Sequence, residues 1–440
     1  MGDYLALMMF PALLLALFMG FHVAFSMMGV ALFFGLVTFD TAVIFQFVQK
    51  VDAVASNFVL AAVPLFVFMG SMLERSGIAG KLFEAVHLWT RRLPGGLAVG
   101  TIVMCVIFAA STGVIGATET VVGLLAIPVM LKYAYDKGLI SGTICAGGSL
   151  GTIIPPSVVV VVLGPVADVS VGDLFVGMIF PGLIMATLYI AYILIRCTID
   201  PKAGPVLPKS DDEPSLIEKV RITLIALAPP VAMIVAVLGS IMFGFAAPTE
   251  AAALGAFGSI LLAVIYKQFS FSILHEAVLK TLKVTCMIML ILLGGNMFAG
   301  VFVASGGVAL AEDLIKAANL ASWATLSVFL FICFLAGFIL DWISVLLIFI
   351  PVFIPIVKSM GFDPVWFCVL FLVVIQTSYL TPPMAPAIFY LRGISPPEIT
   401  LRHMFRGVIP FIVIQILCLV IVALFPQSVL WLPEQLLGFK

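Results

Sequence analysis

The chain has 440 residues, of which 63% are hydrophobic and only 10% are charged, and its formal net charge is −1. Soluble proteins carry about 25% charged residues, so this composition excludes a water-soluble globular protein of this size. Apolar runs of about 20 residues, the length that crosses a lipid bilayer, recur along the whole chain. They predict an all-α polytopic membrane protein.

The first part of the chain, residues 1–197, is predicted to hold five spans and one re-entrant hairpin. Its opening apolar run, residues 4–38, would form a helix of about 50 Å, which is too long for one span, so we expect a break at Gly20-Phe21-His22. The small polar residues and glycines between 109 and 120 are typical of a hairpin tip at membrane depth. The predicted elements are a polar loop or surface helix over 40–56, a span over 57–74, an amphipathic surface helix over 81–92, a hairpin over about 95–131, a helix over 140–163 and a span over 174–195.

The helix predicted over 140–163 contains a motif that breaks it. Pro155 and Pro156 remove two backbone donors and clash with the preceding turn, so a regular helix cannot continue through them. The same feature returns at Thr381-Pro382-Pro383, inside the apolar run 367–390. Broken apolar segments at corresponding positions of two halves are the best sequence indication of a transporter's binding site.

Several residues of the two halves share one spacing. Pro155 and Pro382 are 227 positions apart, as are Pro128 and Pro355, and Asp136 and Asp363. The chain is therefore predicted to consist of two repeats that share one plan.

Residues 198–219, which are hydrophilic and proline-rich, are predicted to be a cytoplasmic linker between the first repeat and a second repeat over 220–440. Each repeat would hold an odd number of crossings, so the second repeat would be inverted relative to the first. The elements predicted for it are spans over about 220–244, 248–266 and 284–304, an amphipathic segment around 312–316, a hairpin over about 323–357, a broken helix over 367–390 and a last span over about 404–425.

The distribution of basic residues gives an orientation. If the first hairpin opens to the cytoplasm, 17 of the 21 Lys and Arg residues lie in cytoplasmic segments, and only Lys50, Lys316, Lys358 and Lys440 do not. The positive-inside rule favours this arrangement, with both termini outside. It also supports two helices, not one, in residues 4–38.

Three carboxylates lie in or beside apolar runs, where a charge costs about 3 kcal/mol at the helix centre. Asp341, at the second hairpin tip, either binds a cation or caps the helix that follows, and the two roles are compatible. Glu119, beside the first tip, is a coupling site, part of a structural pair, or a carboxylate in a wet crevice. Glu250 follows Pro248 and is predicted to be a first-turn carboxylate near the outer interface.

Unwound carbonyls, hydroxyls and half-helix ends at the tips and breaks could hold hard cations such as Na⁺, and free N–H groups at half-helix starts could hold an anion. The alternative for the glycines is close helix packing. The candidate ion-binding residues are Ser111, Thr112, Gly113, Gly116, Gly151, Gly337, Asp341 and Thr381. The candidate substrate-binding residues are Thr152, Pro155, Pro156, Ser157, Ser344, Pro382 and Pro383.

No basic residue is predicted at membrane depth, so an anion would be held by dipoles, hydroxyls and co-bound cations, which favours cation coupling. His22, His87, His275 and His403 fall near predicted ends of spans and are given no proton-relay role. The sequence has no Ser/His/Asp, metal or phosphate-loop constellation, so we expect neither an enzyme nor a cofactor other than the coupling ion.

Four stretches carry a resemblance to a known family: Ala62–Gly70, Gly151–Ser157, Ala247–Ala251 and Thr381–Pro383. With them, the chain resembles the large membrane subunit of tripartite ATP-independent periplasmic (TRAP) transporters over essentially its whole length. The resemblance implies an elevator-type, Na⁺-coupled importer of organic acids in the bacterial inner membrane. It also implies a small four-helix membrane subunit and a periplasmic substrate-binding protein as partners, with Na⁺ at the hairpin tips and substrate between them.

The first tip departs from the Gly-Ser-rich pattern often seen in that family, because it reads Ser111-Thr112-Gly113-Val114-Ile115-Gly116 and is followed by Glu119. This departure suggests a different substrate branch, such as 2-oxo or 2-hydroxy monocarboxylates. Three rivals remain. A stand-alone Na⁺/dicarboxylate carrier would need no binding protein, an ion channel would need a continuous polar pathway, and a membrane-embedded enzyme would need a catalytic constellation at depth.

Overall fold

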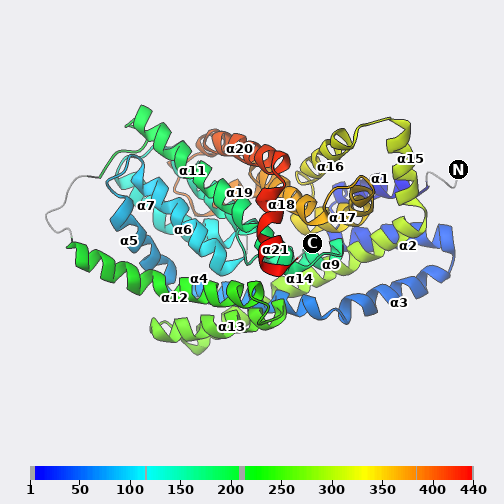
Figure 1. Cartoon of the computed structure of the whole chain (residues 1–440), viewed down its shortest axis with the longest axis horizontal. Coiled ribbons are helices and arrows are strands. Elements are labelled where there is room, and N and C mark those ends of the chain that lie inside the picture. Colours follow the sequence, from blue (N-terminus) through cyan, green and yellow to red (C-terminus); the bar gives the residue numbers. More distant parts are fainter. Residues whose placement is uncertain (1–4, 114–115, 208–213, 383, 439–440) are drawn as a thin grey trace.

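The computed structural model describes residues 5–113, 116–207, 214–382 and 384–438, and within these ranges every regular element is a helix (Figure 1). Seven of the described helices are long and apolar enough to cross a membrane. Large apolar side chains on them face outward, such as Phe257 and Val235, which are 68% and 62% exposed. The predicted class of all-α polytopic membrane protein is confirmed.

The helices at the start of the chain build one side of the molecule. The first two are separated at residues 19–22, where the sequence predicted a break, and Gly20 there has a φ of +90°, which suits a glycine. Residues 40–56, predicted as a loop or a surface helix, are mostly helical. The elements are α1 (Leu5–Phe18), α2 (Val23–Phe39), α3 (Ala42–Ala55), the short η1 (Phe58–Ala61) and α4 (Ala62–Arg75).

The amphipathic helix α5 (Ile78–Thr90) connects this side to the first hairpin. The hairpin consists of α6 (Gly96–Thr112) and α7 (Ala117–Lys132), which pack against each other. Gly95 and Gly113 bound α6, and both have positive φ values, which allow the chain to turn sharply at each end. The hairpin therefore stands where the sequence placed it.

The broken helix of the first half is α8 (Lys137–Ser149), the short η2 (Leu150–Thr152) and α9 (Val158–Ala167). Asp136 caps α8, because its side chain accepts a hydrogen bond from the backbone N–H of Leu139 at 2.9 Å. Pro155 and Pro156 lie between η2 and α9, so the break falls at the predicted motif.

The second half shows the same order of elements. Its hairpin is α16 (Ser322–Ala336) with α17 (Trp342–Ser359), and its broken helix is α18 (Pro364–Leu380) with α19 (Pro386–Ile394). Asp363 caps α18 by accepting from the N–H groups of Val365 and Trp366 at 2.8 and 3.0 Å. The two aspartates that the sequence paired thus begin corresponding helices.

Some predicted bounds were wrong because apolar composition marks the membrane segment and not the whole helix. The span expected over 284–304 is the last part of a 34-residue helix, α14 (Phe271–Ala304), whose first turns are amphipathic. The segment expected over 174–195 is two helices, and the final α21 was not predicted. The remaining elements are α10 (Val171–Gly177), α11 (Ile179–Ile199), α12 (Leu216–Met242), α13 (Pro248–Ile265), α15 (Gly307–Ala317), α20 (Leu401–Leu424) and α21 (Gln427–Leu437).

The segment predicted as a linker is narrower than 198–219, since α11 ends at Ile199 and α12 begins at Leu216. The described first part of this segment is hydrogen-bonded to the residues just before α6 and α8. The carbonyl of Ala203 accepts from the N–H of Asp136 at 2.9 Å, and the carbonyl of Gly204 accepts from the N–H of Gly95 at 3.0 Å. Residues 208–213 lie outside the described part of the chain.

The helices form two groups. Figure 1 shows α3, α4, α12 and α13 along one long side of the molecule, with both hairpins on the other side. We call α1–α4 and α12–α15 the scaffold, and α6–α11 with α16–α20 the hairpin unit. Within the scaffold, α4 and α14 are joined by ion pairs of Arg75 with Glu276 and of Lys280 with Glu74.

Candidate functional site

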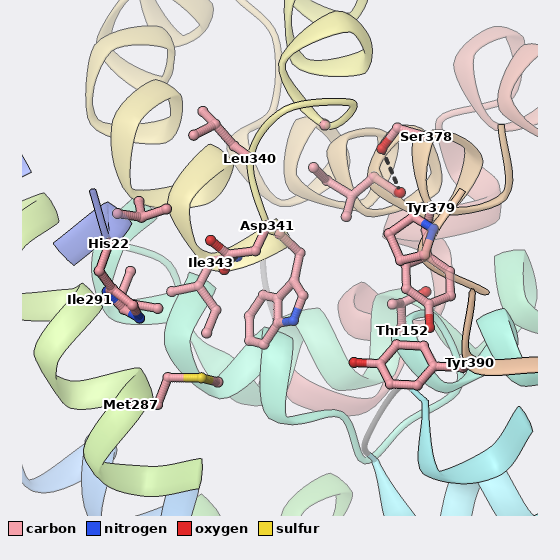
Figure 2. Close-up of a pocket in the computed structure, with 15 residues that line it drawn as sticks. His22, Thr152, Met287, Ile291, Leu340, Asp341, Ile343, Ser378, Tyr379 and Tyr390 are labelled. Atoms are coloured by element: carbon pink, nitrogen blue, oxygen red, sulfur yellow. Dashed lines mark hydrogen bonds between the residues drawn. The ribbon is translucent and has the colours of Figure 1, made fainter. Parts of the chain in front are cut away.

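A cavity of about 370 Å³ lies where the second hairpin tip, both breaks and the scaffold meet. Figure 2 shows Asp341 entering it from the second tip, and Thr152, Tyr379 and Tyr390 facing it from one side. Met287 and Ile291 of α14 line the opposite side, together with His22 from the turn between α1 and α2. The cavity is therefore bounded by the scaffold on one side and by the hairpin unit on the other.

Asp341 begins α17, where the sequence left open a capping role and a cation-binding role for it. Its side chain caps α17, accepting from the N–H of Ile343 at 3.1 Å and from the hydroxyl of Ser344. Asp341 is also exposed and lines the cavity. Ser344 is fully buried and is turned toward the carboxylate of Asp341, so it supports the tip.

The second tip packs directly on the break of its own half. A Cβ atom added to Gly337 would lie 2.2 Å from the Oγ atom of Ser378, so only a glycine fits at this position. Thr381, at the end of α18, donates its hydroxyl to the carbonyl of Thr377 at 2.6 Å. Pro382 lies in the turn between α18 and α19, and Pro383 lies outside the described residues. The structure thus brings Gly337, Asp341 and the second break together.

The first tip has an equivalent arrangement with the first break. The carbonyl of Gly113 accepts from the N–H of Val158 at 3.3 Å, and a Cβ atom on Gly113 would lie 2.7 Å from the carbonyl oxygen of Pro156. The hydroxyls of Thr112 and Ser157 are both buried here and neither has a hydrogen-bond partner. Buried polar atoms are normally paired. A polar ligand beside this helix start could therefore supply the hydrogen-bond partners that the two hydroxyls lack.

Two other candidate ion-binding residues at the first tip, Gly116 and Ser111, already form hydrogen bonds within the protein. Gly116 donates its N–H to Oε2 of Glu119 at 2.7 Å, and its carbonyl accepts from the hydroxyl of Thr120 at 2.9 Å. Ser111 donates to the carbonyl of Ile107 at 2.7 Å. These contacts belong to helix ends, which is the structural alternative for such residues.

Glu119 is fully buried, and its Oε1 atom has no hydrogen-bond partner. Its carboxyl group lies against Gly148 of α8. Gly151 and Thr152 form part of η2, and the hydroxyl of Thr152 donates to the carbonyl of Ser149 at 2.8 Å. Of these residues, Thr152 lines the cavity.

Glu250 lies in the first turn of α13, as the sequence predicted. It is exposed in the first turn of α13, and its Oε2 atom accepts from the N–H of Ala247 at 2.8 Å. This contact satisfies one of the free N–H groups of the helix start. The geometry gives Glu250 a capping role away from the cavity.

Sequence reasoning missed the cavity residues that carry no polar motif. His22 was predicted at a helix break and was given no proton-relay role. It lines the cavity, as do Met287, Ile291, Tyr379 and Tyr390. No Lys or Arg is among the residues that line it. The part of the chain that the structure describes also contains no group of three or more His, Cys, Asp or Glu residues able to hold a metal ion. The cavity therefore combines one carboxylate and one imidazole with hydroxyls and apolar walls.

Comparison with known proteins identifies the class. Residues 10–428 match the family described as "Tripartite ATP-independent periplasmic transporter, DctM component". The chain belongs to this family and is a large membrane subunit of a TRAP transporter. The resemblance drawn from the sequence is confirmed.

Two relatives illustrate the range of the family. The sialic acid TRAP transporter large permease protein SiaM of Vibrio cholerae is 30% identical over 427 residues, covering 96% of this chain and 97% of that protein. The C4-dicarboxylate TRAP transporter large permease protein DctM of Pseudomonas aeruginosa is 28% identical over 388 residues, covering 88% and 89%.

Solved structures support the fold alone. The YdaH transporter of Alcanivorax borkumensis matches with a TM-score of 0.69 at 14% identity, covering 96% of this chain and 98% of that one. The antimetabolite efflux pump MtrF of Neisseria gonorrhoeae matches with a TM-score of 0.60, also at 14% identity, covering 91% and 86%. At this identity the two matches show a shared fold and no more.

Proposed function

We propose that this TRAP large permease imports an organic acid together with Na⁺, with the transport site in the cavity between scaffold and hairpin unit. The observation that carries the proposal is the composition of this cavity. Among the described residues that line it are Asp341 and residues of both breaks, but neither Lys nor Arg. A carboxylate ligand held there without a Lys or Arg side chain needs co-bound cations and helix-start N–H groups.

The substrate class follows from the relatives and from the site. Relatives are named for C4-dicarboxylates, sialic acid and 2,3-diketo-L-gulonate. The half-helix starts of α9 and α17 carry free N–H groups and the positive end of the helix dipole, which suit a carboxylate. The substrate is accordingly an organic acid, with a 2-oxo or 2-hydroxy monocarboxylate as the first compounds to try.

Na⁺ would occupy the two places where a hairpin tip meets its break. At the first, Thr112, Gly113 and Ser157 offer oxygens, two of them unpaired hydroxyls. At the second, Asp341 and Thr381 offer oxygens beside Gly337. Hard monovalent cations are bound by such carbonyl, hydroxyl and carboxylate oxygens at broken helices.

The mechanism is alternating access of the elevator type. Two inverted repeats, residues 1–197 and 220–440, would each contribute one hairpin and one broken helix to a mobile unit, and the scaffold would stay fixed in the membrane. The cavity lies between these groups, so movement of the hairpin unit past α14 would expose the cavity to the two sides in turn.

The partners are a small four-helix membrane subunit and a periplasmic binding protein that delivers the substrate, and the location is the bacterial inner membrane. Membership of the tripartite family supports both statements. The rival is a stand-alone Na⁺-coupled carrier that needs no binding protein.

The test is uptake into proteoliposomes that contain this chain and its small partner. Radiolabelled 2-oxo acids and C4-dicarboxylates are supplied with the candidate binding protein, with and without an inward Na⁺ gradient. We expect uptake only when Na⁺ and the binding protein are both present. Uptake with Na⁺ alone would show a stand-alone carrier, and uptake without any Na⁺ dependence would refute the cation sites.

A further inference from the structure

A buried hydrogen bond joins the two broken helices at equivalent positions of the two halves. Gln376 of α18 donates from Nε2 to Oγ of Ser149, the last residue of α8, at 3.0 Å. Both side chains are fully buried. The two residues are 227 positions apart, the spacing that also relates Asp136 to Asp363. The bond therefore joins residues at matching positions of the two predicted repeats.

The bond lies next to both breaks. On one side, Ser149 directly precedes η2, and its carbonyl accepts from the hydroxyl of Thr152 at 2.8 Å. On the other side, Gln376 precedes Ser378 by two residues, and Ser378 lies against Gly337 of the second tip. The bond therefore links the helix before one break to the helix before the other break through two side chains.

The surroundings of the bond are costly for stability. Gln415 of α20 also donates to Ser149 Oγ, at 3.4 Å. The Oε1 atoms of Gln376 and Gln415 are buried without a partner. Each unpaired buried polar group costs about 1–3 kcal/mol, and an apolar replacement of the same shape is often neutral or stabilising. The free energy of folding alone therefore does not explain why Gln376 and Gln415 carry amide side chains.

We propose that Gln376 and Ser149 are positioning residues that couple the two Na⁺ sites, so that Na⁺ at one tip raises the Na⁺ affinity at the other. The inference rests on the proposed function. The hydrogen bond touches neither ion, and it acts by fixing the two breaks relative to each other. Coupling between two sites requires a shared structural element whose conformational equilibrium is shifted by the ligand at each site.

The test is the Na⁺ dependence of initial uptake by the reconstituted complex of wild type, Gln376→Leu and Gln415→Leu. The wild type is expected to show a Hill coefficient of about 2, which is the number of coupled sites. Gln376→Leu is expected to lower it to about 1 and to raise the half-saturating Na⁺ concentration about fivefold or more. Gln415→Leu is the matched control, since it removes an amide beside the same serine without joining the two breaks.

The outcomes separate this inference from the proposed function. A wild type without Na⁺ dependence refutes the proposed function and the coupling with it. A Na⁺-dependent wild type with a Hill coefficient of one refutes the coupling alone, as does Gln376→Leu with the wild-type coefficient. An equal loss in Gln415→Leu would also refute it, because the effect would then reflect general packing. If Gln376→Leu fails to assemble, Ser149→Ala, which removes one hydroxyl, is judged by the same criteria.

Discussion

Gly70 of α4 lies directly against the backbone carbonyl of Thr112 at the first hairpin tip. A Cβ atom on Gly70 would be 2.4 Å from that carbonyl oxygen, a distance that no real contact allows. Thr112 ends α6, where carbonyls have no partner within the helix, so the tip presents a bare backbone edge to the scaffold. The absence of a side chain at residue 70 allows this close approach between the two groups of helices.

Gly70→Ala is therefore expected to push the first tip away from the scaffold. The forced contact costs about 1–3 kcal/mol, more than the helix propensity that alanine gains. Thermal unfolding of the purified protein and uptake should both show a loss. Gly239→Ala in α12, where a Cβ atom has nothing within 4 Å, is the control and should be neutral or stabilising. Equal behaviour of the two variants would contradict the contact.

Asp341→Asn separates the two roles of that residue. Asparagine caps a helix as well as aspartate does, so the second hairpin should keep its stability. Loss of the negative charge next to a cation should raise the half-saturating Na⁺ concentration about tenfold or more. The measurement is uptake as a function of Na⁺ concentration, with thermal unfolding as the check on folding. An unchanged Na⁺ dependence would show that Asp341 caps α17 and does not bind Na⁺.

Glu250→Ala should affect stability and not transport. The substitution removes the side-chain acceptor for the N–H of Ala247 at the start of α13, and such caps contribute about 0.5–2 kcal/mol. Glu250 is exposed and is not among the residues that line the cavity, so the substrate and Na⁺ concentrations for half-maximal uptake should stay at wild-type values. A changed Na⁺ dependence would give Glu250 a coupling role.

Met287→Trp should close the cavity from the scaffold side. Met287 is 46% exposed and faces a space of about 370 Å³, into which an indole would project. Uptake is expected to fall about tenfold or more, equivalent to about 1.4 kcal/mol. Met289→Trp on the same helix lines a different groove and serves as the control. Full activity of Met287→Trp would place the substrate elsewhere.

The sequence was sufficient for the features that depend on local chemistry. Pro155 and Pro156 cannot continue a helix, so the break was readable without a structure. Asp136 and Asp363 cap corresponding helices, and their equal spacing from the prolines revealed the repeated plan. The start of α14 was predicted too late in the chain, because its first turns are amphipathic and the apolar run alone was taken as the span.

The cavity could not be predicted because its walls come together only in three dimensions. Met287 and Ile291 belong to an ordinary apolar helix face, and nothing in their sequence context distinguishes them from lipid-facing residues. His22 was set aside because it lies at a helix end, yet that end faces Asp341 across the cavity, more than 300 residues away in the sequence. Long-range pairs such as Gln376 and Ser149 became visible only once the helices were placed.

The most direct test of alternating access at this cavity is the labelling of a cysteine placed at Tyr390. Tyr390 lines the cavity and contacts Gly116 at the first tip. Cys286, the one exposed native cysteine, would be replaced by serine, since the other six are buried. A membrane-impermeant thiol reagent is then added to sealed vesicles of either orientation, with and without Na⁺ and substrate. The account predicts labelling from one side at a time, with the labelled side changed by Na⁺ and substrate. Labelling from both sides in one state, as a channel would allow, would contradict it.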